Sequence, residues 1–250
     1  MQRISTGSKS LDNLLCGGIE TKAVTEFYGE HSSGKTQISH TLCTIVPQNK
    51  SQGGISGKSI YIDTEGKFRP ERIVSIAQAR GFNTIYTLSN IIHVRLRTSH
   101  PQESIIEKVR SLVDKNKSTT RLLIVDSVIS NYRAEFSGVR TLSERQQRLY
   151  QFMRKLSGIA QTYGIAVVVT NHVNYSDHPY APKPAGGNIM AHTSNYRISI
   201  RRLRSHHNND DDKDDDSNQI VATIVQSPYH LENKTCFIIS EKGMEDADIV

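Results

Sequence analysis

Apolar runs rich in β-branched residues alternate with stretches of helical periodicity between residues 24 and 170. The clearest helical stretch is Ser143–Tyr163, where apolar side chains recur three and four positions apart and Ser143 with Gln146 forms a capping-box pattern. This alternation predicts an α/β fold with a mostly parallel central sheet and helices on both faces. The predicted strands are Val24–Tyr28, Ser59–Asp63, Ile91–Leu96, Arg121–Asp126 and Ile165–Thr170, and the other predicted helices are Thr36–Val46, Pro70–Arg80 and Pro101–Lys115.

The pattern changes after residue 194, where three apolar runs follow one another with no helical stretch between them. They cover Arg197–Leu203, Gln219–Gln226 and Thr235–Ser240, and we interpret them as an antiparallel extension of the same sheet. The polar, acidic residues 206–218 are predicted to form a disordered hairpin tip. The chain is therefore expected to form a single domain over residues 1–250.

Composition predicts a soluble globular protein, because 36% of the 250 residues are hydrophobic and 22% are charged. No apolar run reaches the roughly 18 residues that a membrane-spanning helix needs, and the N-terminal residues lack the apolar segment of a secretory signal. The three cysteines form no C-x-x-C pair, which argues against a disulfide framework or a zinc site. We therefore expect an intracellular protein without membrane contact.

Charge is unevenly distributed along the chain. The whole chain carries a formal charge of +6, but Asp210–Asp216 contains six aspartates and one lysine, a local charge of −5, which leaves +11 on the rest. A body this basic favours a polyanionic partner, with nucleic acid as the leading candidate. Charge alone leaves open the alternative of a basic surface that binds nothing.

One motif fits a phosphate-binding pattern at every fixed position. It reads G-x-x-x-x-G-K-[ST] and lies between a predicted strand and a predicted helix, which is the context that such a loop requires. Backbone N–H groups of the loop and the positive end of the helix dipole would face phosphate oxygens. Lys35 would reach the β- and γ-phosphates, and the Thr36 hydroxyl would ligate Mg²⁺. The motif comprises Gly29, Glu30, His31, Ser32, Ser33, Gly34, Lys35 and Thr36.

Two acidic residues follow apolar strands, at the sheet edge where α/β proteins bind nucleotides. Asp126 ends the predicted strand Arg121–Asp126 and could hold Mg²⁺ through water, opposite Thr36. Glu65 follows the predicted strand Ser59–Asp63 and could orient the water that attacks a phosphate. The alternative for Glu65 is a helix-capping or surface carboxylate.

These motifs together resemble the ATPase core of the RecA-like recombinases, in particular the archaeal RadA and eukaryotic Rad-type branch. The resemblance covers nearly the whole chain in order and spacing. It implies a RecA-like P-loop ATPase core that uses ATP and Mg²⁺, binds single- and double-stranded DNA, and self-associates into a filament or ring. The runs that carry it are Thr6–Asp12, Gly17–Thr21, Gly34–Gln37, Asp63–Gly66, Phe68–Arg72, Tyr132-Arg133, Leu142-Ser143, Arg145-Gln146, Thr170-Asn171 and Gly186–Asn188.

The resemblance also implies roles for individual residues. Glu65 would activate water, Arg72 would pack on adenine, and Gln37 would join the phosphate loop in nucleotide binding. Two loops would hold DNA, the first running from Tyr132 to Arg145 and the second from Asn174 to Asn188, with cations for phosphates and tyrosines for stacking on bases. The tyrosines could equally be ordinary surface residues. The expected DNA-binding residues are Arg133, Arg140, Arg145, Tyr175, Tyr180, Lys183, Gly186, Gly187 and Asn188.

Several positions depart from the family pattern. His172 stands where the family usually has the glutamine that senses the γ-phosphate, and the charge of a histidine depends on pH. Val139 replaces a DNA-contacting arginine, and Gln226 and Leu231 replace an Asp and a Pro that close the neighbour's ATP site. The second loop is short, and the family's helical N-terminal domain and self-association linker are absent from the sequence.

Three functions compete on this basis. The first is an active recombinase that pairs homologous strands in recombinational repair, with a DNA-dependent ATPase activity. The second is a paralogue that binds ATP and regulates a full-length recombinase without exchanging strands. The third, a nucleotide switch without DNA, is disfavoured by the loop arginines and the basic body. We favour the recombinase, in the cytoplasm if archaeal or the nucleus if eukaryotic.

Overall fold

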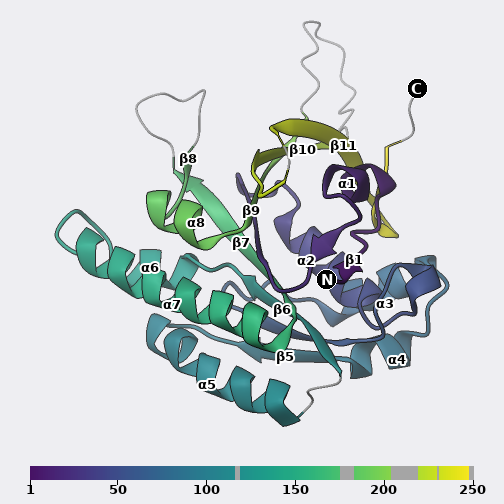
Figure 1. Ribbon diagram of the computed structural model, residues 1–250, viewed down its shortest axis with the longest axis horizontal. Helices are drawn as coiled ribbons and strands as arrows, with labels where there is room; N and C mark the ends of the chain where they lie inside the picture. The colour runs from purple at the N-terminus through teal and green to yellow at the C-terminus, as the bar shows by residue number, and fades with distance from the viewer. Residues whose placement is uncertain (116–118, 175–182, 204–218, 230, 248–250) are drawn as a thin grey trace, which may run out of the picture.

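The computed structural model describes residues 1–115, 119–174, 183–203, 219–229 and 231–247 (Figure 1). Within these residues a ten-stranded sheet has the order β12-β11-β10-β9-β3-β7-β6-β4-β5, with β8 paired to β7 off this path, and β1 and β2 form a separate pair. The strands are β1 (Arg3–Ile4), β2 (Ile19–Glu20), β3 (Val24–Gly29), β4 (Lys58–Asp63), β5 (Ile91–Arg95), β6 (Thr120–Asp126), β7 (Ala166–Asn174), β8 (Lys183–Pro184), β9 (Tyr196–Arg202), β10 (Gln219–Gln226), β11 (Asn233–Ser240) and β12 (Gly243–Asp246).

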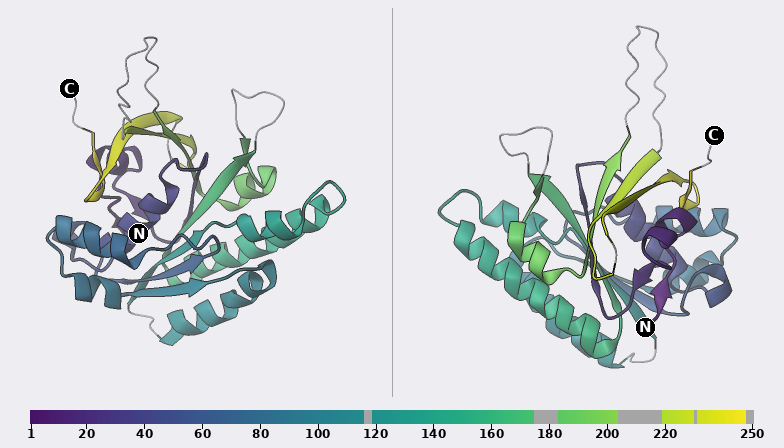
Figure 2. Two further views of the ribbon diagram at one scale, coloured as in Figure 1. Left: turned by 180° about the vertical axis from the view of Figure 1, so that it is seen from behind. Right: turned by 45° about the horizontal axis from the view of Figure 1, so that its top comes forward.

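The strands from β9 to β5 pair in parallel, and β9, β10, β11 and β12 pair antiparallel. This confirms the predicted α/β class and its antiparallel extension, which Figure 2 shows in two further views. The central strands are buried on both faces, as expected for parallel sheets covered by helices.

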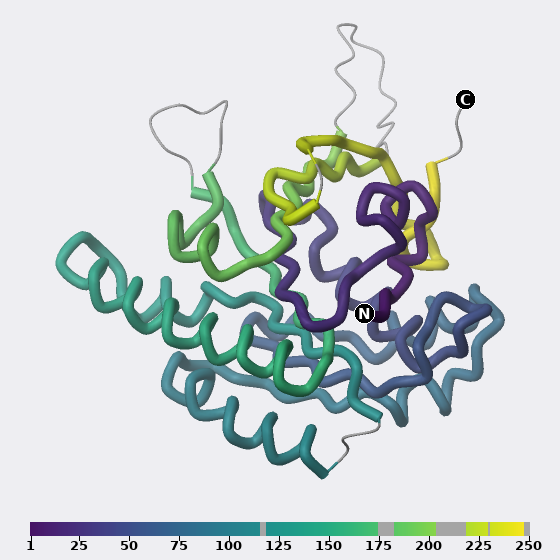
Figure 3. The backbone as a smooth tube through the Cα atoms, viewed as in Figure 1, coloured from purple at the N-terminus to yellow at the C-terminus, as the bar shows by residue number. Residues whose placement is uncertain are grey.

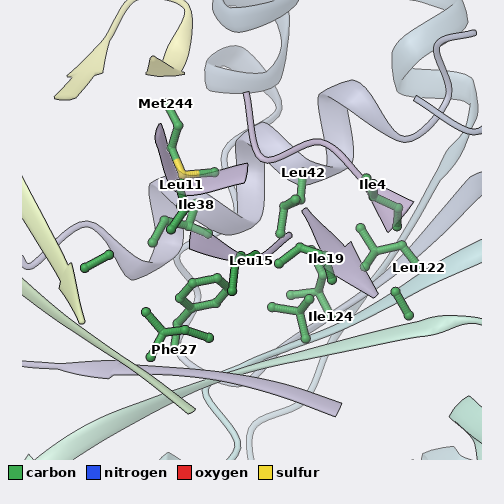
Figure 4. Packing of buried hydrophobic residues seen from close by; sticks show 14 of the residues in the cluster. Ile4, Leu11, Leu15, Ile19, Phe27, Ile38, Leu42, Leu122, Ile124 and Met244 are labelled. Atoms are coloured by element: carbon green, nitrogen blue, oxygen red, sulfur yellow. The ribbon is translucent and has the colours of Figure 1, made fainter. Parts of the chain in front are cut away.

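Helices cover both faces of the sheet. Side chains of β6 alternate, so that Leu122 and Ile124 join one hydrophobic cluster and Leu123 and Val125 join the other. The first cluster also contains Leu11 of α1 and Ile38 and Leu42 of α2 (Figure 4), together with a residue of α3. The second cluster contains residues of α5 and α7. The helices are α1 (Lys9–Leu14), α2 (Lys35–Ile45), α3 (Pro70–Ala79), α4 (Thr84–Ser89), α5 (Ser99–Lys115), α6 (Ser130–Glu135), α7 (Leu142–Tyr163) and α8 (Gly187–Thr193), with a 3₁₀ turn at Lys50–Gln52.

The N-terminal segment packs against the C-terminal strands. Helix α1 contacts β11 and β12, which are far from it in sequence (Figure 3). At the junction, Asp246 Oδ1 accepts hydrogen bonds from Ser8 Oγ at 2.7 Å and from the Ser10 backbone N–H at 2.8 Å. The antiparallel extension is therefore fixed to the body of the protein close to the start of the chain.

Some sequence predictions were wrong in detail. Helix α7 begins at Leu142 after Thr141, and no side chain caps it, so the predicted capping box at Ser143 and Gln146 does not form. The helix starts earlier because the Arg145 N–H donates to Thr141 O, while the Thr141 hydroxyl donates to Ser137 O. The helices and strands that the sequence did not predict are the short elements α1, α4, α6, α8, β1, β2, β8 and β12.

The first predicted DNA loop is also partly helical, because Arg133 lies in α6 and Arg145 in the first turn of α7. The second loop ends in β8 and α8, so Gly187 and Asn188 begin a helix. Tyr175, Tyr180 and the acidic stretch 206–218 lie outside the described residues. In the part of the chain that is described, no helix combines the length and apolar character needed to cross a membrane.

Candidate nucleotide-binding and catalytic site

The register of the parallel strands brings the predicted site residues to one edge of the sheet. Gly29 at the end of β3 pairs with His172 of β7 on one side and with Ile200 of β9 on the other. Asp63 of β4 pairs with Asp126 of β6 at the same level. Residues that are far apart in sequence therefore converge at the carboxyl ends of these strands, where α/β proteins bind ligands.

Two glycines shape the phosphate loop between β3 and α2. A Cβ on Gly29 would lie 2.2 Å from the backbone oxygen of Ile200, so only glycine allows β9 to approach this closely. Gly34, the residue before α2, has a φ of 101°, in the left-handed region that glycine adopts readily. The first N–H groups of α2 lack intrahelical acceptors by geometry and are available to an anion.

The Lys35 ammonium lies within the phosphate loop. Its Nζ donates to Gly29 O at 2.9 Å, to Glu30 O at 2.5 Å and to Ser33 Oγ at 3.1 Å. Burial lowers the pKa of Lys35 to about 8, although the nearby carboxylates of Asp126 and Glu65 oppose this shift. The loop thus holds a buried cation at the place where the sequence predicts phosphate binding.

Asp126 and Thr36 form a pair of oxygen ligands next to this lysine. The Thr36 hydroxyl donates to Asp126 Oδ2 at 2.9 Å, and the Tyr61 hydroxyl donates to the same oxygen at 2.6 Å. Thr170 donates to the other carboxylate oxygen, and Asp126 is only 2% exposed. A hydroxyl and a carboxylate at this distance are the hard oxygen ligands that Mg²⁺ prefers.

Three donors hold the Glu65 carboxylate. Oε1 contacts His172 Nε2 and accepts from the Ser130 hydroxyl, while Oε2 lies 2.5 Å from Lys67 Nζ. Burial alone would raise the pKa of Glu65, but the hydrogen bonds from His172, Lys67 and Ser130 outweigh it and hold this pKa well below its usual range. Glu65 is therefore an ionised, oriented carboxylate.

Asp63 fixes the loop that carries Glu65. Its Oδ1 accepts backbone N–H bonds from Glu65 at 3.0 Å, Gly66 at 2.6 Å and Lys67 at 3.2 Å. The Arg95 guanidinium donates to the same oxygen at 2.9 Å. From the sequence, Asp63 was predicted only as the end of a strand, although an aspartate followed by a glycine turn is a common signal for such side-chain-to-backbone bonds.

These residues surround one cleft of about 300 Å³. It brings together the phosphate loop from His31 to Gln37 with Glu65, Asp126 and His172, as predicted from sequence. Gly29 and Glu30 lie at the start of the same loop and bind Lys35 through their carbonyls. The wall also includes four residues that were not predicted as site residues, namely Lys67, Arg69, Thr170 and Arg202.

Arg72 does not line this cleft. Its Nε donates to Gln37 Oε1 at 2.7 Å, and its other nitrogens donate to the backbone oxygens of Ser240 at 2.5 Å and Glu241 at 3.2 Å. Arg72 thus links α3 to α2 and to the turn between β11 and β12. Its bond to Gln37 connects it to a residue that lines the cleft, and its predicted contact with adenine stays a prediction.

Comparison with known proteins identifies the family. A family model described as Rad51 matches residues 1–247. The chain belongs to the Rad51 family. It is also 40% identical over 248 residues to the "DNA repair and recombination protein RadA" of Cenarchaeum symbiosum (strain A). That alignment covers 98% of this chain and 59% of the relative, so the chain spans about 59% of that relative's length. The resemblance inferred from sequence is confirmed.

The two predicted DNA loops of this Rad51-family chain meet in a second cavity of about 540 Å³. Five of the predicted residues line it, whereas Arg140 and Asn188 are exposed outside it. Val139, which replaces the family's arginine, is 87% exposed next to Arg140. The five lining residues are Arg133, Arg145, Lys183, Gly186 and Gly187.

Strand β7 connects the two cavities. Asn171 Nδ2 donates to the backbone oxygen of Ala185, where the second loop returns, and to the buried Glu26 carboxylate, both at 2.7 Å. The Ala185 N–H donates to His172 O at 2.8 Å. The residue that contacts Glu65 is therefore bonded directly to the returning end of the second loop.

Two other family departures lie at the end of β10 and beyond it in sequence. Gln226 Nε2 donates to the backbone oxygens of Ala191 at 2.8 Å and Ser194 at 3.1 Å, so it ties β10 to α8 within the chain. Leu231 is 90% exposed. Neither residue lines the nucleotide cleft.

Proposed function

We propose that this chain is the core of an ATP-dependent DNA recombinase. In this proposal it binds ATP with Mg²⁺, hydrolyses it in a DNA-dependent manner, binds single-stranded DNA and pairs it with a homologous duplex. The observation that carries the proposal is one cleft where a phosphate loop, a Thr36–Asp126 oxygen pair and the Glu65 carboxylate meet. Membership of the Rad51 family and the likeness to a RadA protein support it.

In this proposal each residue of the cleft has its own role in ATP hydrolysis. Lys35 and the N-terminus of α2 would bind the phosphates, while Thr36 and Asp126 would hold Mg²⁺, which supplies positive charge to the phosphate oxygens when bound. Glu65 would orient the attacking water and accept its proton. Its lowered pKa suits the first task, because the carboxylate stays ionised at neutral pH and can accept a hydrogen bond from water.

DNA binding would use the second cavity. Arg133, Arg145 and Lys183 present three cations around it, and cations that pair with phosphates bind independently of base sequence. The Ala185 N–H donates to His172 O, and the Ala185 carbonyl accepts from Asn171 Nδ2. These two bonds offer a route by which DNA could influence the ATP cleft. Self-association into a filament or ring on DNA is part of the proposal.

Replacing the proposed catalytic carboxylate tests the ATPase. Glu65→Gln removes the proton acceptor but keeps the shape of the side chain, so we expect ATP binding to persist while turnover falls by about a hundredfold or more. The measurements are ATP affinity and the hydrolysis rate, with and without single-stranded DNA. Glu71→Gln is the matched control, because Glu71 is an exposed acid in the first turn of α3 and does not line the cleft. Unchanged turnover in Glu65→Gln would remove Glu65 from the mechanism.

A strand-exchange assay tests the recombinase itself. The chain with ATP, Mg²⁺ and homologous DNA should exchange strands on its own. Activity that appears only when a full-length recombinase is added would instead identify a mediator that binds ATP without exchanging strands. Absence of any effect, alone or in the mixture, would contradict both functions.

A further inference from the structure

The His172 imidazole shares the Glu65 carboxylate with two other donors. His172 comes from β7, Ser130 from α6, and Lys67 from the loop that follows β4. The side chains of His172 and Glu65 are 21% and 12% exposed, so the contact is largely shielded from water. Three separate elements therefore converge on one carboxylate, and each contributes a different kind of donor.

Of these three types of donor, only an imidazole ordinarily changes its charge near neutral pH. A serine hydroxyl is neutral, and a lysine ammonium ordinarily keeps its charge in this range. An imidazole gains or loses a proton between about pH 5 and pH 8, whereas the family's glutamine amide at this position donates without titrating. The other charged or titratable side chains of the cleft are His31, Lys35, Arg69, Asp126 and Arg202.

We infer that His172 is a positioning residue for Glu65 and that its proton controls the carboxylate's ability to act on water. The inference rests on the proposed function, in which Glu65 serves ATP hydrolysis. A neutral imidazole orients Glu65 by one hydrogen bond. A protonated imidazole adds a full positive charge beside Oε1, where Lys67 already neutralises Oε2, and so lowers the basicity of the carboxylate.

The chemical step shows where this basicity matters. The water oxygen forms a bond to the γ-phosphorus, the bond from that phosphorus to the β–γ bridging oxygen breaks, and ADP leaves with those electrons. The proton released by the water passes to Glu65. A protonated His172 opposes this transfer because it stabilises the carboxylate in its unprotonated form. Hydrolysis therefore slows as the pH falls through the titration of His172.

The pH dependence of turnover tests the inference in the variant His172→Gln, which keeps a donor and removes the titration. At saturating ATP, Mg²⁺ and single-stranded DNA, wild-type kcat should fall severalfold or more between pH 7.5 and pH 5.5, because imidazoles gain a proton in this range. In His172→Gln, kcat should change by less than about twofold over that range. Measurements stop at pH 7.5 because burial lowers the pKa of Lys35 to about 8, which would affect both proteins.

A matched control separates this effect from other histidines. His100→Gln changes an exposed histidine of α5 that does not line the cleft, and it should keep the wild-type pH profile. Thermal unfolding of each variant at pH 7.5 checks that the fold is retained. An unchanged pH profile in His172→Gln would overturn the inference.

A second measurement does not depend on hydrolysis. The titration of the His172 ring is followed by NMR in the wild type and in Glu65→Gln, which removes the negative partner. Protonation of His172 should shift to lower pH in Glu65→Gln, because the ion pair that favours the charged ring is absent there. An identical titration in both proteins would show that the two groups are not coupled. If the wild type hydrolyses no ATP at any pH, the proposed function fails, while this titration still decides the coupling.

Discussion

At the scale of single residues, Arg202 adds to the cleft a cation that was not predicted from the sequence. It lies at the end of β9, two positions beyond Ile200, the residue that pairs with Gly29 of the phosphate loop. Its side chain lines the cleft, and among the described residues its buried Nε has no hydrogen-bond partner. A guanidinium with an unused donor next to a phosphate loop suits the recognition of phosphate oxygens.

Removal of this cation should weaken nucleotide binding. Arg202→Ala is expected to raise the Kd for Mg²⁺–ATP about tenfold, the usual effect of losing one charge-assisted hydrogen bond. Titration with a fluorescent nucleotide measures this. Arg201→Ala is the matched control, because Arg201 is exposed and points to the opposite face of β9. Equal losses of affinity in both variants would assign the effect to net charge and contradict a direct contact.

The main residues of the cleft could be predicted from sequence for a simple reason. A phosphate loop has a fixed local spacing, and acids at the ends of apolar strands must come to the same edge of a parallel sheet, as Glu65 and Asp126 do. The contact between His172 and Glu65 could not be predicted, because it joins side chains 107 residues apart whose directions depend on packing. Arg202 could not be predicted as a cleft residue either, because the direction of its side chain also depends on packing.

At the scale of elements, a buried polar network joins three parallel strands below the cleft. Glu26 of β3 is fully buried, and its carboxylate accepts from Arg197 Nε of β9 at 2.6 Å and from Asn171 Nδ2 of β7 at 2.7 Å. Burial raises the pKa of Glu26, while the Arg197 charge and the bond from Asn171 oppose the shift. The network ties the phosphate-loop strand to the strand that carries His172.

Breaking this network from one side should be costly. Arg197→Met leaves the Glu26 carboxylate buried without its cation, so we expect the free energy of unfolding to fall by about 3–5 kcal/mol. The double variant Glu26→Gln with Arg197→Met removes both charges and should be destabilised less than the single variant. Urea unfolding at pH 7 measures both. A double variant that is no more stable than Arg197→Met would show that buried charge is not the cause.

The long elements were predictable, while the short ones were not. Helix α7 and strands such as β6 carry enough apolar positions to reveal their period, and their predicted ranges differ from the observed ones by one or a few residues. Helices such as α1, α4 and α6 have six residues each, too few to show a period. The capping box failed because the turn before α7 supplies backbone bonds that start the helix earlier.

At the scale of the whole molecule, the distribution of charge matters more than its sum. The net charge is +6, yet the proposed DNA site depends on a few arginines of the first loop. Arg133 and Arg145 line the second cavity, and Arg140 of the same loop is exposed. Other exposed cations lie on α5, including Lys108 and Lys115. A nonspecific attraction to DNA would depend equally on the arginines of the first loop and on the cations of α5. A defined binding site would depend on the arginines of the first loop.

Two triple variants, each of which removes three positive charges, distinguish a defined DNA-binding site from nonspecific attraction. The first changes Arg133, Arg140 and Arg145 to Ala, and the second changes Lys108, Arg110 and Lys115 of α5 to Ala. Affinity for single-stranded DNA is measured against salt concentration. Removing one cation that pairs with a phosphate should reduce the slope of log K against log salt by about 0.7, so the slope should fall by up to about 2 in the first variant and hardly change in the second. Equal reductions of the slope in both variants would show that binding to DNA depends only on the net charge. A reduction confined to the α5 variant would place the binding surface on that helix.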